Sequence, residues 1–153
     1  MNSIDLAKFI IKHRRISEKV LGIFTQEELI NLKHRSDKPA VIVNVGKEGQ
    51  EVGHWVAIYT GEFSEFFDPL GKEPKYYSPA IDSFLSNRNQ KQYIYSLTPM
   101  QGMNSISCGQ FILYFLYYKC HGHSYSNILD TFTDNAEKND ELVIKFVREH
   151  QSF

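Results

Sequence analysis

The chain has 153 residues, of which 42% are hydrophobic and 23% charged, and its formal net charge at pH 7 is −1. These values are ordinary for a globular protein and predict one compact domain over residues 1–153. The balanced charge excludes the strongly basic class of nucleic-acid-binding proteins. The basic cluster at 12–15 is better explained as a solvated helix face, which leaves nucleic-acid binding uncertain.

The two cysteines, Cys108 and Cys120, are twelve residues apart on one predicted helix. That spacing separates them by about 18 Å, which is too far for a disulfide. Free thiols are typical of a reducing compartment, no apolar run reaches the length of a membrane span, and the N-terminus lacks signal-peptide features. We therefore expect an intracellular monomer that does not contact a membrane.

The first two elements predicted along the chain are helices. Apolar spacing predicts a helix over Ser3–His13, with Ser3 as a possible N-cap. Further on, Thr25 and Glu28 form a capping-box pattern that predicts a short helix over 26–33.

A strand and a hairpin come next. Pro39 interrupts the chain, and the β-branched run 40–45 predicts a central strand, followed by a loop over 46–50. The runs 53–59 and 63–68 then predict a hairpin with its loop at 60–62. Reflection about Gly61 places the following residues opposite each other: Tyr59 and Phe63, Val56 and Phe66, His54 and Asp68.

The second half of the chain predicts mainly helices. These elements, with the helices and strands before them, predict an α+β layer fold. The helix over 107–120 is apolar on nearly every side, so we expect it to be buried, with Gly122 ending it. The other elements are a turn at 69–71, a helix over 78–85 capped by Ser78 with Pro79 at its first position, a strand over 92–97, a short helix over 127–132, and an amphipathic helix over 140–150 with Leu142, Val143, Phe146 and Val147 inward.

Cys108 is the strongest candidate for a nucleophile. A polar loop, 101–107, leads directly into the apolar helix, so Cys108 lies in its first turn. The unpaired N–H groups and positive end of the helix dipole there favour a thiolate. Gln101, seven residues earlier, could aim an amide donor beside the Cys108 N–H, and two such donors form an oxyanion hole.

The predicted hairpin supplies the other groups that such a nucleophile needs. His54 is the candidate base and Asp68 the group that orients it, because opposed residues share one face of the sheet. Two other carboxylates, Glu62 and Glu65, are alternatives to Asp68, but one lies in the turn and the other faces Ala57 in the reflected register. The segment 120–123 contains Cys, His and His, but a metal site there lacks a second pair of ligands.

Three segments together resemble a known family. Gly53-His54-Trp55, Phe67-Asp68-Pro69-Leu70-Gly71 and the run from Gln101 to Phe111 resemble the adenovirus maturation protease (adenain) and its relatives in polinton-like transposons, adintoviruses and virophages. The ubiquitin-like-protein-specific proteases are more distant relatives. The order His, acid, Gln, Cys and the Gln-to-Cys spacing both match.

The resemblance implies a papain-like cysteine protease architecture, in which a central mixed or antiparallel sheet packs on a buried helix that carries the cysteine. It implies a cysteine endopeptidase that cleaves viral capsid or core precursor proteins at Gly-Gly or Gly-X-Gly sites, in the host cytoplasm or nucleus and in the virion. His54, Asp68, Gln101 and Cys108 are then catalytic. The residues expected to bind substrate are Gly53, Trp55 and Asn104, with Trp55 as a wall of a narrow channel.

Some properties of the adenoviral enzyme are not carried over. That enzyme depends on a viral peptide and DNA, but this chain is shorter and not basic, so neither cofactor is supported. No metal is expected either. An isopeptidase that processes a ubiquitin-like protein is the first alternative function, and a catalytically silent binding module is the second.

Overall fold

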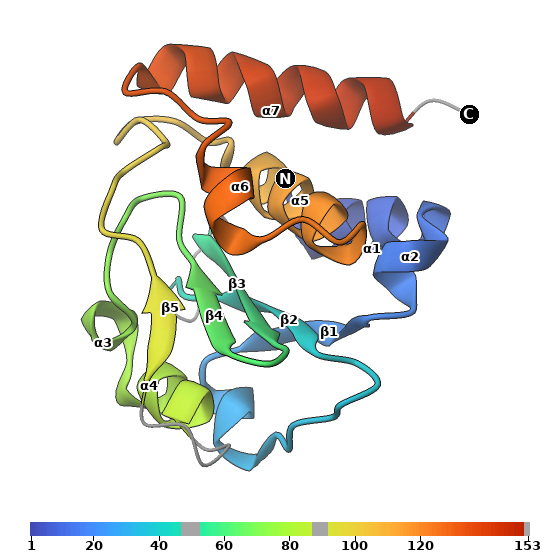
Figure 1. The fold of residues 1–153 in the computed structure, drawn as a ribbon, viewed down its shortest axis with the longest axis vertical. Coiled ribbons are helices and arrows are strands. Elements are labelled where there is room, and N and C mark those ends of the chain that lie inside the picture. The colour runs from blue at the N-terminus through green and yellow to red at the C-terminus, as the bar shows by residue number, and fades with distance from the viewer. Residues whose placement is uncertain (47–52, 87–91, 152–153) are drawn as a thin grey trace.

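The computed structural model describes residues 1–46, 53–86 and 92–151, in which a mixed five-stranded sheet lies between two layers of helices (Figure 1). The strand order is β1-β2-β3-β4-β5, with β1 parallel to β2, β4 parallel to β5, and the other pairs antiparallel. The fold is therefore α+β, as predicted. The elements in chain order are α1 Ser3–Lys12, α2 Arg14–Ser17, β1 Val20–Thr25, the 3₁₀-helix Glu27–Asn31, β2 Ala40–Asn44, β3 Trp55–Thr60, β4 Ser64–Phe67, α3 Pro74–Tyr77, α4 Pro79–Ser86, β5 Tyr93–Tyr95, α5 Cys108–Cys120, α6 Tyr125–Leu129 and α7 Ala136–Gln151.

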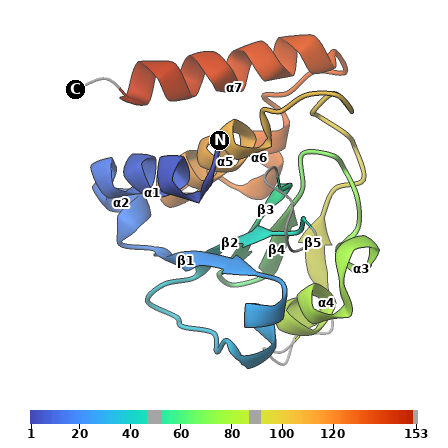
Figure 2. The ribbon, with the colours of Figure 1, turned by 180° about the vertical axis from the view of Figure 1, so that it is seen from behind.

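The sheet separates two hydrophobic cores, because successive side chains of a strand point to opposite faces. One face of β2 and β3, with Ile42 and Ala57, packs against α1, α5, α6 and α7. The other face, with Val43 and Ile58, packs against α4 and the 3₁₀-helix. Figure 2 shows the helices on the two sides of the sheet from behind. Burial on both faces explains why residues 40–45 read as a continuous apolar run.

Helix α5 is the centre of the larger core. Each residue from Phe111 to Leu116 is buried, and the ring of Phe115 stacks on that of Phe67 in β4 with 4.5 Å between centroids. The predicted boundaries of this helix are confirmed. Gly122 ends it with a φ of 90°, and the N–H of His123 bonds to the carbonyl oxygen of Tyr118.

Two other predicted caps are also present. The N–H of Thr25 donates to the Glu28 carboxylate, and the N–H of Glu28 donates to the Thr25 hydroxyl, although the segment that follows is a 3₁₀-helix. Ser78 accepts a hydrogen bond from the N–H of Ala80 at the start of α4.

Several predictions about individual helices and strands are wrong or incomplete. The N-cap of α1 is Asn2, which forms a capping box with Asp5, and not Ser3. Strand β1 and the short helices α2 and α3 were not predicted. Leu142 is 37% exposed and does not point inward, whereas Val143, Phe146 and Val147 do. Residues 47–50 of the predicted loop lie outside the described residues.

The hairpin forms, but its register is two residues away from the prediction. Ile58 lies opposite Phe66 and Tyr59 opposite Glu65, because the turn occupies 61–63 and not 60–62. A shift of two residues keeps every side chain on its predicted face, since the side-chain period of a strand is two. His54 and Asp68 therefore stay on a common face, as diagonal neighbours.

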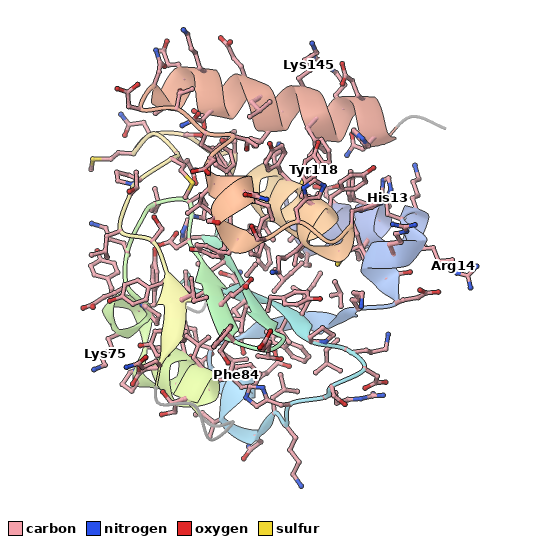
Figure 3. All side chains as sticks on the ribbon, viewed as in Figure 1. His13, Arg14, Lys75, Phe84, Tyr118 and Lys145 are labelled. Atoms are coloured by element: carbon pink, nitrogen blue, oxygen red, sulfur yellow. The ribbon has the colours of Figure 1, made fainter. Side chains whose placement is uncertain are left out.

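The predicted basic cluster belongs to the start of α2 and the end of α1. Arg14 points away from the molecule in Figure 3 and pairs with Glu18 at 2.7 Å. His13 is half-buried and its Nε2 lies 3.0 Å from the carbonyl oxygen of His150. None of the helices in the described ranges is long and apolar enough to cross a membrane.

Candidate active site

Cys108 is the first residue of α5 and only 7% of its surface is exposed. Its Sγ lies 3.9 Å from the carbonyl oxygen of Gly53, so the start of α5 lies against the segment that enters β3. Burial alone would raise the pKa of the thiol. Hydrogen bonds from His54 and from the N–H groups of Trp55 and Gly109 outweigh burial and lower the pKa of Cys108.

His54 lies directly before β3, where its carbonyl oxygen accepts a bond from the N–H of Val45 and extends the β2–β3 ladder. Its Nε2 is 2.6 Å from Oδ1 of Asp68, and the thiol of Cys108 is close enough to the imidazole to affect its pKa. Burial lowers the pKa of His54, but the bonds to Asp68 and Cys108 prevail and raise it to about 9. The opposite shifts of the two pKa values favour an imidazolium beside a thiolate.

Asp68 directly follows β4 and its side chain is only 1% exposed. Each of its oxygens accepts two hydrogen bonds. Oδ1 accepts from His54 and from the N–H of Leu70 at 3.0 Å, and Oδ2 accepts from the N–H of Lys72 at 3.1 Å and from the hydroxyl of Tyr77. A buried carboxylate with four donors has a fixed orientation, and it fixes the imidazole in turn.

Tyr77, which the sequence did not single out, completes this group. It lies at the end of α3, donates its hydroxyl to Asp68, and stacks its ring on His54 with 5.8 Å between centroids. The pKa of Tyr77 is raised by burial and by the carboxylate of Asp68, so the hydroxyl keeps its proton. No local pattern marks the residue, because the helix that presents it is only four residues long.

The turn after Asp68 connects this group to the loop that carries Gln101. The carbonyl oxygen of Pro69 accepts bonds from the N–H groups of Met100 and Gln101, at 2.8 and 2.9 Å. Gly71 has a φ of 72°, and a Cβ there would lie 2.6 Å from the backbone nitrogen of Pro99. The residues Asp-Pro-Leu-Gly thus make a turn that only glycine can close against the backbone of residues 97–99.

Gln101 is buried, and its Nε2 donates to the carbonyl oxygen of Ser105 at 2.9 Å. This bond fixes which end of the amide is the nitrogen, and the second Nε2 hydrogen is not used by it. Its Oε1 is buried and has no hydrogen-bond partner among the described residues. The amide is therefore held inside its own loop, seven residues before Cys108.

The predicted substrate-binding residues lie in different surroundings. The Cα of Gly53 lies so close to Asn44 that a Cβ would be 2.1 Å from the Asn44 side-chain oxygen. Trp55 is buried in the larger core and donates its indole N–H to the carbonyl oxygen of Met1, so little of the ring faces outward. Asn104 is exposed in the turn of the 100–107 loop.

The alternatives that the sequence offered lie elsewhere. Glu65 pairs with Lys119 at 3.0 Å, and Glu62 lies in the exposed turn of the hairpin. His121 bonds through Nδ1 to the carbonyl oxygen of Tyr117, and no cluster that could hold a metal occurs in residues 1–46, 53–86 and 92–151. Cys120 differs sharply from Cys108, because burial raises the pKa of its thiol to about 11.

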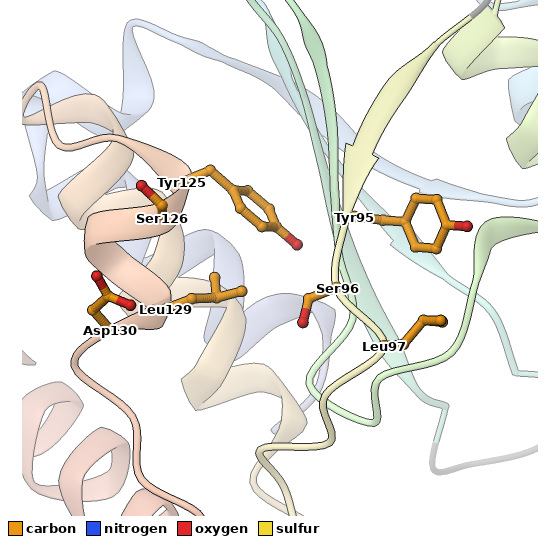
Figure 4. A pocket seen from close by; sticks show the side chains of 7 residues that line it. All are labelled: Tyr95, Ser96, Leu97, Tyr125, Ser126, Leu129 and Asp130. Atoms are coloured by element: carbon orange, nitrogen blue, oxygen red, sulfur yellow. The ribbon is translucent and has the colours of Figure 1, made fainter.

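A separate pocket of about 620 Å³ lies between α6 and the end of β5 with the segment that follows it (Figure 4). Leu129 and Tyr125 reach from α6 toward this segment, and the Tyr125 hydroxyl donates to the carbonyl oxygen of Phe66. None of the residues lining the pocket belongs to the group around Cys108. The lining residues are Tyr95, Ser96, Leu97, Tyr125, Ser126, Leu129 and Asp130.

Comparison with known proteins supports the fold. No protein-family model matches the chain, and no protein of curated function matches it at a significant level. A similar solved structure is the central domain of the uncharacterized Lpg1148 protein from Legionella pneumophila, with a TM-score of 0.56 and 19% sequence identity. The match covers 99% of this chain and 95% of that chain. At this identity the likeness concerns the fold alone.

Proposed function

We propose that the chain is a cysteine endopeptidase with a papain-like site, in which Cys108 is the nucleophile, His54 the acid and base, and Asp68 the residue that orients His54. One observation carries the proposal. The imidazole of His54 lies 2.6 Å from a buried carboxylate, and it interacts with the thiol at the start of α5, whose pKa it lowers. This is the arrangement that cysteine hydrolysis requires.

In the proposed cycle, the Cys108 thiolate attacks the carbonyl carbon of the scissile peptide bond. The oxyanion that forms accepts hydrogen bonds from the Cys108 N–H and from the Gln101 amide. The C–N bond breaks as the His54 imidazolium gives its proton to the leaving amine. His54 then takes a proton from water, the hydroxide attacks the thioester, and the thiolate is released with the new carboxylate.

The proposed substrates are viral capsid or core precursor proteins, cleaved at Gly-containing sites during virion maturation. The resemblance of the three motifs to adenain supports this class. Access to the site supports it too, because Cys108 is 7% and the His54 side chain 18% exposed. A substrate backbone without side chains approaches such a sulfur most closely.

Hydrolysis of a peptide panel tests the proposal. We expect cleavage of peptides with Gly-Gly or Gly-X-Gly sites by the wild-type protein and by Cys120→Ala, and none by Cys108→Ala. Cys120 is the matched control, because it is the second free, buried thiol in the described residues and lies on the same helix. Full activity of Cys108→Ala would refute the nucleophile assignment.

A second panel of ubiquitin-like precursors separates the endopeptidase from an isopeptidase or processing protease. Cleavage confined to folded ubiquitin-like precursors would replace the proposed substrate class and keep the chemistry. Absence of hydrolysis in both panels, together with a Cys108 that does not react with an alkylating agent faster than Cys120, would favour a silent binding module.

A further inference from the structure

The loop 100–107, which carries Gln101 and leads to Cys108, is held at both ends by the second turn of α7. Asn139 is 1% exposed and donates its Nδ2 to the carbonyl oxygen of Met100 at 3.1 Å. At the other end, Asp140 accepts a hydrogen bond from the hydroxyl of Ser107 at 2.7 Å. Helix α7 is distant in the sequence but lies across α5 in both ribbon views (Figures 1 and 2).

Ser107 is the N-cap of α5, yet its side chain makes no cap hydrogen bond. An N-cap serine ordinarily accepts from the N–H of the second or third helical residue, here Gly109 or Gln110. The Ser107 hydroxyl instead donates to Asp140 and lies 2.6 Å from the hydroxyl of Ser105. Asp140 therefore draws the serine away from the N–H groups at the start of α5.

The same chain of bonds reaches Gln101. The Ser105 hydroxyl accepts from the N–H of Ser107 at 3.2 Å, which folds this segment into a tight turn. The carbonyl oxygen of Ser105 then accepts from Nε2 of Gln101. Asp140 is thus linked through Ser107 and Ser105 to the side-chain amide, and through Ser107 to the first turn of α5.

We propose that Asp140 is a positioning residue: through Ser107 and Ser105 it aims the Gln101 amide at the oxyanion, and it keeps the Ser107 hydroxyl away from the N–H groups of Gly109 and Gln110 in the first turn of α5. This inference rests on the proposed function. It explains why the serine at the N-cap position does not cap the helix. It also gives the first half of α7 a role in the reaction.

Kinetics on the peptide substrate give the first test. In Asp140→Ala the Ser107 hydroxyl is released to cap α5, and we expect kcat to fall by about 10- to 100-fold while KM changes by less than about twofold. Asp140→Asn keeps an oxygen acceptor and should restore most of kcat. The matched control is Glu141→Ala, the exposed neighbour on α7, which should behave as wild type.

Coupling between the two residues separates positioning from a general structural effect. If Asp140 acts through Ser107, the kcat of the double variant Asp140→Ala/Ser107→Ala should be no lower than the kcat of the less active single variant. Losses that multiply, or a kcat that is unchanged in Asp140→Ala, would overturn the proposal. Ser107→Ala also serves if Asp140→Ala fails to fold.

A second measurement does not depend on activity. The ¹H–¹⁵N resonances of the Gln101 side-chain amide, assigned by their loss in Gln101→Glu, report its bond to Ser105. We expect them to move in Asp140→Ala and in Ser107→Ala, and to stay in place in Glu141→Ala. If the wild-type protein hydrolyses no peptide, the proposed function fails but this comparison still decides the positioning role. Unchanged resonances in both variants would overturn it.

Discussion

Asp68→Asn is the substitution that tests the site most directly. Each oxygen of the Asp68 carboxylate accepts two hydrogen bonds, and all four donors are N–H or O–H groups. An asparagine replaces one oxygen by an NH₂ group, which cannot accept. In either orientation of the amide, two donors lose their acceptor, and one orientation leaves His54 without its partner.

The magnitude follows from the pKa of His54. Its rise from 6.5 to about 9 corresponds to about 3 kcal/mol in favour of the imidazolium. Burial opposes this rise, so loss of the Asp68 charge should lower the pKa of His54 by about 2 units. The Cys108 thiolate then loses its cation, and the pKa of Cys108 should rise. At neutral pH both changes reduce the fraction of molecules that hold the reactive thiolate–imidazolium pair.

Two titrations measure these changes. The ring resonances of His54 give its pKa directly, and the rate of Cys108 alkylation by iodoacetamide against pH gives that of the thiol. Asp82→Asn is the control, because Asp82 also accepts from a tyrosine hydroxyl, that of Tyr93, outside the site. If Asp68→Asn leaves both titrations where the wild-type protein has them, the assignment of Asp68 as the orienting group is wrong.

Three more substitutions address the same group. Gln101→Ala removes an oxyanion donor, so we expect kcat for the peptide to fall by about 10²–10³-fold; an unchanged kcat would argue against that role. Tyr77→Phe keeps the ring over His54 but removes the donor to Asp68, and urea titration should find the free energy of unfolding lower by about 1.5–3 kcal/mol. Because its pKa is raised, His54 contributes stability that is present below pH 6.5 and lost as the pH rises through about 9. The pKa of Cys108 is lowered, so this residue contributes stability that is present above pH 9.0 and lost as the pH falls through the lowered value. Cys108→Ala removes the second contribution, so its free energy of unfolding should fall more steeply between pH 6.5 and 9 than that of the wild-type protein, and parallel curves would contradict the ion pair.

The hairpin illustrates how a sequence pattern can place two residues together while the pairing is misassigned. Reflection about Gly61 put His54 directly opposite Asp68, whereas the observed register pairs Ala57 with Phe67. The error is two residues, and the period of a strand is two, so both side chains kept their face. An error of one residue would have turned His54 and Asp68 to opposite faces.

Other features leave no local signal in the sequence. Strand β1 contains Gly22, and its register with β2 is irregular between Val20 and Gly22, so its β-pattern is weak. Tyr77 and Asp140 act through side-chain contacts to residues nine and thirty-three positions away. Periodicity and capping patterns describe contacts within one element, and these contacts join different elements.

The candidate site is assembled from two parts, one on the sheet and one on a helix, and the hydrophobic core packs these two elements together. His54 directly precedes β3 and Asp68 directly follows β4, while Cys108 begins a helix packed on the sheet. The stacked rings of Phe67 and Phe115 join β4 to this helix. Substitution of Phe115 by a smaller residue should therefore cost stability first. The relative placement of the reactive atoms depends instead on a few polar contacts, those of Asp68 with its four donors and of Pro69 with the following loop. Changes at these contacts should reduce activity while costing less stability than substitutions in the core. The reason is that they alter the alignment of groups and not the burial of apolar surface.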